Sequence, residues 1–345
     1  MAERVFLHVG QPKTGTTYLQ TILWSHRDRI AEADGVCVPG DTRVDHLWTS
    51  LAVREDPRLH KRSERAPGAI DRVLAASAAW PGTVVVSHEF FGAARADQAA
   101  ALVERFAPAE VHVVVTAREP ASLMAAAWQE SLKFRQTTPL RDFAAGPEDD
   151  TSKVWSLRSL DLAGVLDRWA PAVPAGQVHV LPLPHQRGEP DELWHRFAGL
   201  VGIDGPAYDT AVARANPSMP LVETELLRRL TPRLTTFRDP LARHRWVRSH
   251  LAETLLAGRP GDRVGLYDDQ LAACRARGEA AVEAVRRHGV QVHGDVDHLR
   301  VPAALPAQHT PEDVSEADLA AVTVRTLATM VADLRRLREG GLPPT

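Results

Sequence analysis

The sequence holds few cysteines, no long apolar run and no large excess of charge of either sign. Its two cysteines, Cys37 and Cys274, are far apart and lack metal-ligand spacing, so we expect reduced thiols and no disulfide framework. No apolar stretch approaches the roughly 18 residues that span a bilayer, so we expect no membrane partner. The net charge of −3 gives no general attraction to nucleic acid, so any anion site must be local.

The chain begins Met-Ala-Glu-Arg and enters an apolar stretch at once, without the basic start and apolar middle of a signal peptide. This pattern predicts a cytoplasmic protein. A length of 345 residues is enough for one large α/β domain with a sizeable core.

A short apolar run ends at Gly10, and a Thr-rich turn after it opens a helix expected over residues 16–30. The first backbone N–H groups of a helix have no intrahelical partner, and the helix dipole favours negative charge there. The segment therefore predicts a phosphate-binding loop. Gly10 and Gly15 have Walker A spacing, but Thr16 stands where the nucleotide-binding lysine would be, and the lysine is Lys13 inside the loop.

Two further buried strands deliver polar residues to the same predicted edge of a parallel sheet. Residues 83–87 form a β-branched run followed by His88 and Glu89, which are placed for proton transfer at a strand's carboxyl end. Adjacent side chains on an extended segment point to opposite faces, so we expect only one of the pair to reach a substrate. Residues 111–117 form the next strand, which leads into Arg118, Pro120 and a helix over 121–134.

The pattern of residues 12–17, together with the strand, Arg-x-Pro and helix of 111–134, resembles the sulfotransferases that use 3′-phosphoadenosine 5′-phosphosulfate (PAPS). The resemblance implies a bacterial member with an α/β, three-layer P-loop-like fold, in which a central parallel sheet is flanked by helices. It implies that PAPS is the co-substrate and that no metal is needed. The nucleotide-binding residues it implies are Gln11, Pro12, Lys13, Thr14, Gly15, Thr16, Thr17, Arg118, Ser122 and Arg214.

The resemblance also implies roles for these residues. Lys13 stabilises the leaving phosphate, and either Glu89 or His88 takes the proton of the acceptor; we favour Glu89 slightly. Arg118 holds the 3′-phosphate, since its planar guanidinium makes bidentate bonds to phosphate. The family's serine is expected at a position that is Ala126 here, and Ser122 is either a substitute for it or the N-cap of the helix.

A late loop with Arg214, Asn216 and Ser218 is expected either to fold over the nucleotide or to form a simple turn. We expect a sulfotransferase-like domain over residues 1–300, with its core at 4–220 and a helical part at 221–300. A helical extension is expected over 301–345, where the pattern of 312–338 predicts a long helix that packs on the body or on a second copy as a homodimer.

The sequence does not identify the acceptor. A small-molecule natural product and a carbohydrate, carrying a hydroxyl or an amine, are equally compatible with it. Three rival interpretations remain. An atypical P-loop kinase would use ATP and Mg²⁺, a non-catalytic homologue would bind the nucleotide as a scaffold or sensor, and a structural domain would bind no nucleotide.

Overall fold

The computed structural model describes residues 1–143, 155–186, 188–189, 191–213, 218–237 and 239–339. The chain divides into two compact units. An α/β unit combines Met1–Met124, Ala144–Ala215 and Ala272–Pro302, and a helical unit combines Ala125–Phe143, Asn216–Leu271 and Ala303–Thr345. These units do not coincide with the expected division at residue 300, because the helical unit draws on three separate segments.

The α/β unit is built on one parallel sheet with the strand order β2-β3-β1-β4-β5-β6. Its strands are Val36–Cys37 (β2), Thr83–Ser87 (β3), Arg4–Gly10 (β1), Glu110–Ala117 (β4), Val178–Pro182 (β5) and Gln291–Val292 (β6). Strand β6 was not expected, because two residues carry too little periodicity to predict a strand. The expected strands at 83–87 and 111–117 are confirmed within one residue.

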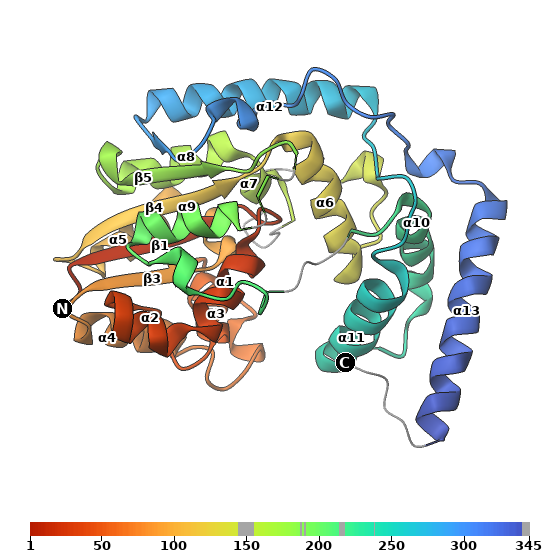
Figure 1. Cartoon of the computed structure of the whole chain (residues 1–345), viewed down its shortest axis with the longest axis horizontal. Coiled ribbons are helices and arrows are strands. Elements are labelled where there is room, and N and C mark those ends of the chain that lie inside the picture. The colour runs from red at the N-terminus through yellow and green to blue at the C-terminus, as the bar shows by residue number, and fades with distance from the viewer. Residues whose placement is uncertain (144–154, 187, 190, 214–217, 238, 340–345) are drawn as a thin grey trace. The chain divides into compact units, whose positions relative to one another are not determined.

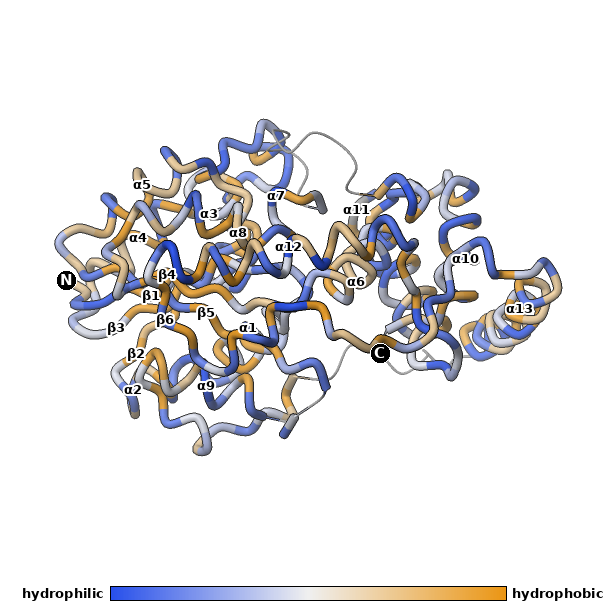
Figure 2. The backbone as a smooth tube through the Cα atoms, turned by 90° about the horizontal axis from the view of Figure 1, so that it is seen from above, coloured by the Kyte–Doolittle hydropathy of each residue, from blue (hydrophilic) through white to orange (hydrophobic). Residues whose placement is uncertain are grey.

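Helices cover both faces of this sheet and make three layers (Figures 1 and 2). One face packs against α1 (Thr16–Ser25), α2 (Arg27–Asp34) and α9 (Glu192–Val201), around the buried Phe6, Leu23 and Trp194. The other packs against α4 (Ala69–Ala79), α5 (Ala96–Glu104), α8 (Leu162–Trp169) and α12 (Asp268–Arg287). Helices cover both faces of the sheet, so each central strand is buried on both sides. This is why the sequences of these strands are nearly continuous apolar runs.

Three expected helices differ in their bounds. The helix predicted over 16–30 is broken at His26, whose backbone is not helical and whose ring contacts the Asp209 carbonyl at 2.8 Å. The sequence of residues 155–169 has the apolar pattern of one helix, but the structure has two, α7 (Leu157–Leu160) and α8, because the Asp161 side chain accepts from the Gly164 N–H and starts a new helix. The long C-terminal helix, α13, runs over Glu316–Arg338 with the expected Ser315–Asp318 capping box.

Further α-helices are α3 (Arg43–Val53), α6 (Pro120–Lys133), α10 (Leu221–Leu230) and α11 (Pro240–Arg243), a π-helix follows over His244–Leu256, and short 3-10 helices lie between these elements. Helix α6 begins in the α/β unit and continues into the helical unit. Over the described ranges, no helix is both long and apolar enough to cross a bilayer.

Candidate functional site

The strand order places three loops of interest side by side. Strand β1 lies between β3 and β4, and all three run in the same direction, so their carboxyl ends meet at one edge of the sheet. In open parallel sheets, ligands bind at this edge, where the strand order reverses. The loop after β1 carries Lys13, β3 leads into His88 and Glu89, and β4 leads into Arg118. The structure therefore brings these residues to one edge, as the sequence predicts.

Several side chains of the β1 loop are buried and fix its shape. The Gln11 N–H donates to the Thr116 carbonyl at 2.7 Å, and the Gln11 side chain donates to the Leu160 carbonyl at 2.9 Å. The Thr14 hydroxyl donates to the Gln11 carbonyl at 2.6 Å. Pro12 and Thr16 are also buried. The buried residues of this loop, although predicted to bind the nucleotide, therefore fix the loop's shape. The side chain of Lys13 is partly exposed and that of Thr17 is exposed.

Lys13 and Gly15 have left-handed backbone conformations, with φ of 64° and 85°. At Gly15, a Cβ atom would lie 2.5 Å from Leu193 Cδ2, a side-chain tip that could shift, so it is mainly the left-handed backbone that favours glycine here. Helix α1 starts directly after it, with no acidic residue in its first turn and, over the part of the chain described, no side chain capping its first amides. The amino end of α1 thus presents backbone N–H groups and a nearby lysine, a suitable environment for an anion.

A polar ladder crosses the sheet beneath this loop. Buried His8 joins Ser87 Oγ at 2.8 Å to Thr116 Oγ1 at 3.1 Å, and Thr116 Oγ1 contacts Thr14 Oγ1 at 2.6 Å. Burial lowers the pKa of His8 to about 4, so the ring is neutral at pH 7. The ladder links β3, β1 and β4 to the loop and sets where the loop lies relative to Glu89.

Glu89 lies against the loop. A Cβ atom at Gly10 would come within 3.3 Å of the Glu89 carbonyl oxygen, which shows how closely the two backbones pass. The Gln20 amide of α1 donates to Glu89 Oε2 at 3.2 Å, and the Arg43 guanidinium donates to Gln20 Oε1 at 2.9 Å. Burial acts to raise the pKa of Glu89, but His88, the backbone amide and Gln20 outweigh it and bring the pKa below its usual value. Glu89 is therefore ionised at neutral pH.

His88 is held differently. Its Nδ1 accepts from the Phe90 N–H at 3.1 Å, which caps the short helix Glu89–Ala93. This bond assigns the proton of the neutral ring to Nε2. Burial, assisted by the charges of Arg43 and Arg54, lowers the pKa of His88 although Glu89 acts to raise it. The nitrogen that could accept a proton is therefore already engaged with the backbone.

The amino end of α6, after Arg118, is closed. The Glu119 carboxylate accepts from the N–H groups of Ala121 and Ser122, each at 2.7 Å, and only 4% of Glu119 is exposed. The expectation that Ser122 is an N-cap is wrong, because Glu119 caps this helix. Ala126 lies farther along α6 and is half-buried.

The late loop offers little more. Arg214 and Asn216 lie outside the described residues, and Ser218 is exposed. Among the residues that can be described, no group of three His, Cys, Asp or Glu side chains could hold a metal ion.

Sequence reasoning missed the residues that support the site. These are His8, Gln20, Arg43, His46, Thr116 and Glu119. His46 is typical of them, because its Nδ1 accepts from the Ser87 N–H at 3.2 Å and its Nε2 contacts the Pro39 carbonyl at 2.8 Å. Polar residues within apolar strands, such as His8 and Thr116, were the available signal. A carboxylate just before a helix-opening proline was the signal for Glu119.

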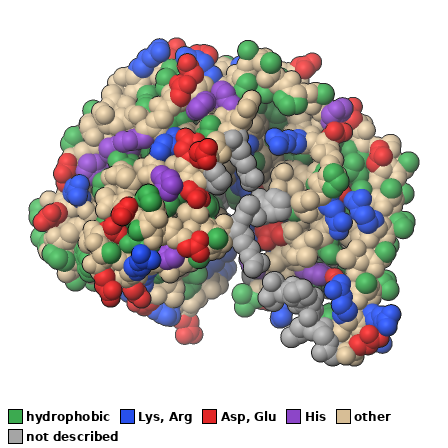
Figure 3. Space-filling view, in the orientation of Figure 1, with side chains coloured by type: hydrophobic (Ala, Val, Ile, Leu, Met, Phe, Trp, Pro, Cys, Tyr) green, Lys and Arg blue, Asp and Glu red, His purple; other side chains and the backbone are tan. Residues whose placement is uncertain are grey.

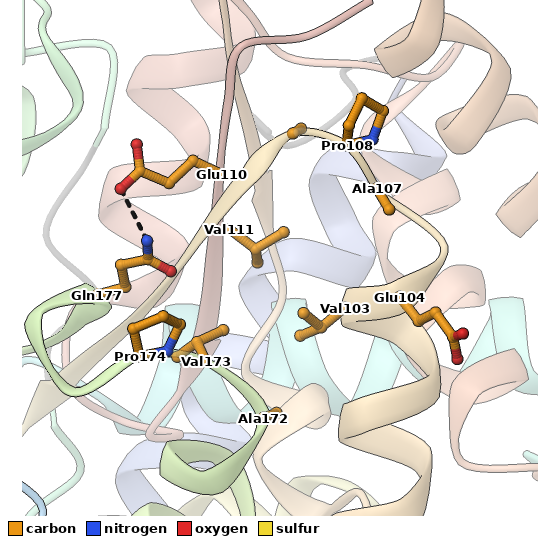
Figure 4. Close-up of a pocket in the computed structure, with 11 residues that line it drawn as sticks. Val103, Glu104, Ala107, Pro108, Glu110, Val111, Ala172, Val173, Pro174 and Gln177 are labelled. Carbon is orange, nitrogen blue, oxygen red and sulfur yellow. Dashed lines mark hydrogen bonds between the residues drawn. The ribbon is translucent and has the colours of Figure 1, made fainter.

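A hollow of about 410 Å³ lies at the other end of the sheet, at the start of β4 (Figure 4). It is lined by Val103, Pro108, Val111 and Pro174 and is bordered by a hydrogen bond of 2.7 Å from the Gln177 amide to Glu110 Oε1. It brings together none of the predicted site residues, so the carboxyl edge of the sheet remains the candidate site.

Comparison with known proteins adds no relative: no family model, no curated protein and no solved structure matches this chain.

Proposed function

We propose that this protein transfers a sulfuryl group from PAPS to a hydroxyl or amine of a small-molecule or carbohydrate acceptor. One observation carries the proposal: the amino end of α1, which begins after Gly15, has no acidic residue in its first turn and has Lys13 in its loop, lies beside an ionised Glu89. An anion-binding group and a proton acceptor thus share one strand edge.

The phosphosulfate half of PAPS fits the β1 loop. Lys13 supplies a positive charge, and the amides that open α1 supply donors, with no carboxylate in the first turn to compete with them. The fit to the 3′-phosphate is only partial. Arg118 offers charge, but the α6 amides already bind Glu119. We therefore assign the 3′-phosphate contact to Arg118 and not to the amino end of α6 or to the Ser122 amide.

The reaction needs a proton acceptor and a stabilised leaving group. As the acceptor's oxygen or nitrogen forms its bond to sulfur, its proton passes to the Glu89 carboxylate. The bond from sulfur to the bridging oxygen breaks, and negative charge grows on the 5′-phosphate of the departing 3′-phosphoadenosine 5′-phosphate (PAP). Lys13 and the first amides of α1 stabilise that charge, and such donors contribute about 3–4 kcal/mol each when well placed. The fixed loop holds the reacting groups in line.

Between the two candidate bases, the geometry favours Glu89. His88 Nδ1 is engaged by the Phe90 N–H, and a proton on Nε2 makes that nitrogen a donor. Glu89 is ionised and is oriented by Gln20, whose own carbonyl oxygen is held by Arg43. Glu89→Gln should abolish transfer, whereas His88→Asn should retain part of it.

A second candidate, a structural domain that binds no nucleotide, is favoured by Glu119. A carboxylate at the place where the 3′-phosphate is expected would repel that phosphate and already occupies the α6 amides. An atypical kinase using ATP and Mg²⁺ is favoured less, since Thr16 replaces the lysine that such a loop needs.

A thermal-shift panel of PAP, ADP, ATP and ATP with Mg²⁺ tests the proposal. A ligand at a hundred times its Kd adds about 2.7 kcal/mol of stability. We expect PAP to stabilise the protein most, without Mg²⁺, and Arg118→Ala to reduce its advantage over ADP. Equal stabilisation by ADP, or a strict need for Mg²⁺, would contradict it. Turnover of PAPS with a panel of phenols, alcohols, sugars and amines then separates the enzyme from the scaffold.

A further inference from the structure

Helix α13 has two apolar faces, and of these the inner one is buried among the described residues while the outer one is exposed. The inner face, with Leu319, Val322 and Thr326, is buried, and Arg325 beside it donates to Glu223 Oε1 of α10 at 2.5 Å. On the outer face, Val324 is 67% exposed, Leu327 54%, Val331 64% and Leu334 59%. Figure 3 shows hydrophobic side chains on the surface at the side of the view where Figure 1 draws α13.

The outer residues follow a heptad. Positions 317, 320, 324, 327, 331 and 334 alternate in steps of three and four, which places them on one seam of the helix. Exposed alanines flank them, and no charged residue lies on this seam between Ala317 and Leu334. With 23 residues, α13 is about 35 Å long, so the seam is continuous over several turns. Single exposed apolar residues are ordinary, but a seam of this length indicates a partner helix.

We propose that this seam pairs with the same seam of a second copy of the chain, in an antiparallel, two-fold symmetric arrangement. The charges of α13 favour that orientation. Its first turn carries Glu316 and Asp318, and its last turn carries Arg335, Arg336 and Arg338. Parallel pairing would bring like charges together at both ends, whereas antiparallel pairing sets the acidic end of each copy against the basic end of the other.

One register satisfies the whole seam. With Val324 opposite Leu327 of the second copy, symmetry sets Ala320 opposite Val331 and Ala317 opposite Leu334. Each small residue then faces a large one, as close packing between helices requires.

The same register matches the charges at the ends. It brings Arg335, in the last turn of α13, level with Glu316 in the first turn of the second copy. A two-fold interface must be complementary to itself in this way. The match of spacing, size and charge in one register identifies a second copy as the occupant of the seam.

Sedimentation analysis of the full chain tests the pairing. We expect a dimer at micromolar concentration, and Leu327→Glu should raise its dissociation constant by about a hundredfold or more, since it buries a charge at the centre of the seam. Leu241→Glu is the matched control, because Leu241 is 80% exposed in the same unit but lies on α11. Circular dichroism shows whether each variant keeps its helix content. A wild-type monomer, or a dimer unchanged by Leu327→Glu, would overturn the proposal.

Cysteine cross-linking tests the register without depending on a destabilised variant. Under mild oxidation, an equal mixture of the Val324→Cys and Leu327→Cys proteins should form mixed disulfide dimers in excess of the dimers that either protein forms alone. The unmodified protein, with its native Cys37 and Cys274, is the control. Dominant self-linkage of Leu327→Cys would indicate parallel pairing, and absence of any new cross-link would show that the seam does not pair. Either result would overturn the antiparallel dimer.

Discussion

The amino ends of α1 and α6 follow neighbouring strands of one sheet, yet among the described residues a side chain caps that of α6 and leaves that of α1 open. At α1, Gly15 contributes no side chain and the first amides have no side-chain acceptor within the described ranges. At α6, the Glu119 carboxylate occupies the amides of Ala121 and Ser122. Both helices carry the same dipole, so the residue before each helix decides whether its amino end can bind an external anion. This difference assigns the phosphosulfate to α1 and leaves Arg118 to act at α6 through its charge.

Removal of the Lys13 charge should have the largest effect on anion binding at the amino end of α1. We expect Lys13→Ala to weaken PAP binding by about ten- to a hundredfold, because a charged hydrogen bond contributes about 1.5–3 kcal/mol. Isothermal titration calorimetry measures the change. Lys61→Ala is the matched control, since Lys61 is an exposed lysine of the same unit, in the short 3-10 helix Leu59–Lys61 and outside the β1 loop. An equal effect of both variants would show that Lys13 acts only through overall charge.

Acid should lower the stability that buried His8 contributes beneath the β1 loop. The pKa of His8 falls from 6.5 to about 4 on burial, so the unfolded chain binds this proton more readily than the folded protein. His8 therefore contributes stability above pH 6.5 that is lost as the pH falls to about 4, a loss on the order of 3 kcal/mol.

Denaturant titrations at a series of pH values measure this loss. The buried rings of His46 and His179 have the same shift to about 4 and add to the acid sensitivity of the wild type. His8→Asn should flatten the dependence between pH 6.5 and 4 without removing it. An unchanged slope in this variant would contradict the role given to His8.

Substitution of Gly15 should damage the turn that keeps α1 open. We expect Gly15→Ala to lower the free energy of unfolding by about 1–2 kcal/mol, because an L-residue is disfavoured at φ of 85° and its Cβ would meet Leu193. Chemical denaturation measures the loss.

Two matched variants sharpen this test. Gly199→Ala, in the interior of α9 with no atom near its Cβ position, should be neutral or stabilising. Adding Leu193→Ala to Gly15→Ala should relieve the contact with Leu193 but not the backbone cost. Full recovery of stability would show that the left-handed conformation is unimportant.

The smallest effect is expected from Glu119→Gln at the closed end. The single amide oxygen can keep only one of the two backbone bonds, so we expect a stability loss of about 1 kcal/mol from the lost bond and the lost charge at the helix end. With a negative charge removed near the amino end of α6, the preference for PAP over ADP should rise. A fall in that preference, measured by calorimetry, would mean that Glu119 helps to place Arg118 and does not compete with the phosphate.

The sequence was most informative where apolar runs and glycines dictate the backbone. We could predict the buried strands at 83–87 and 111–117 and the loop before α1, because β-branched runs and turns rich in glycine have strong local signatures. The meeting of Lys13, Glu89 and Arg118 at one edge also followed, since parallel strands end together.

The residues that tune the site could not be found in this way. The links from Arg43 through Gln20 to Glu89 and from Ser87 through His8 to Thr116 join segments distant in sequence. A single sequence shows no pairing between such positions. The division into two units could not be predicted for the same reason, because the helical unit is built from three segments that are far apart in the sequence.

Calorimetric titration of the wild-type protein with PAP and with ADP, both without Mg²⁺, measures whether the site selects a 3′-phosphorylated nucleotide. We predict that PAP binds at least about tenfold more tightly than ADP, a difference of about 1.4 kcal/mol. Equal affinities for the two nucleotides, or no binding of PAP, would contradict it.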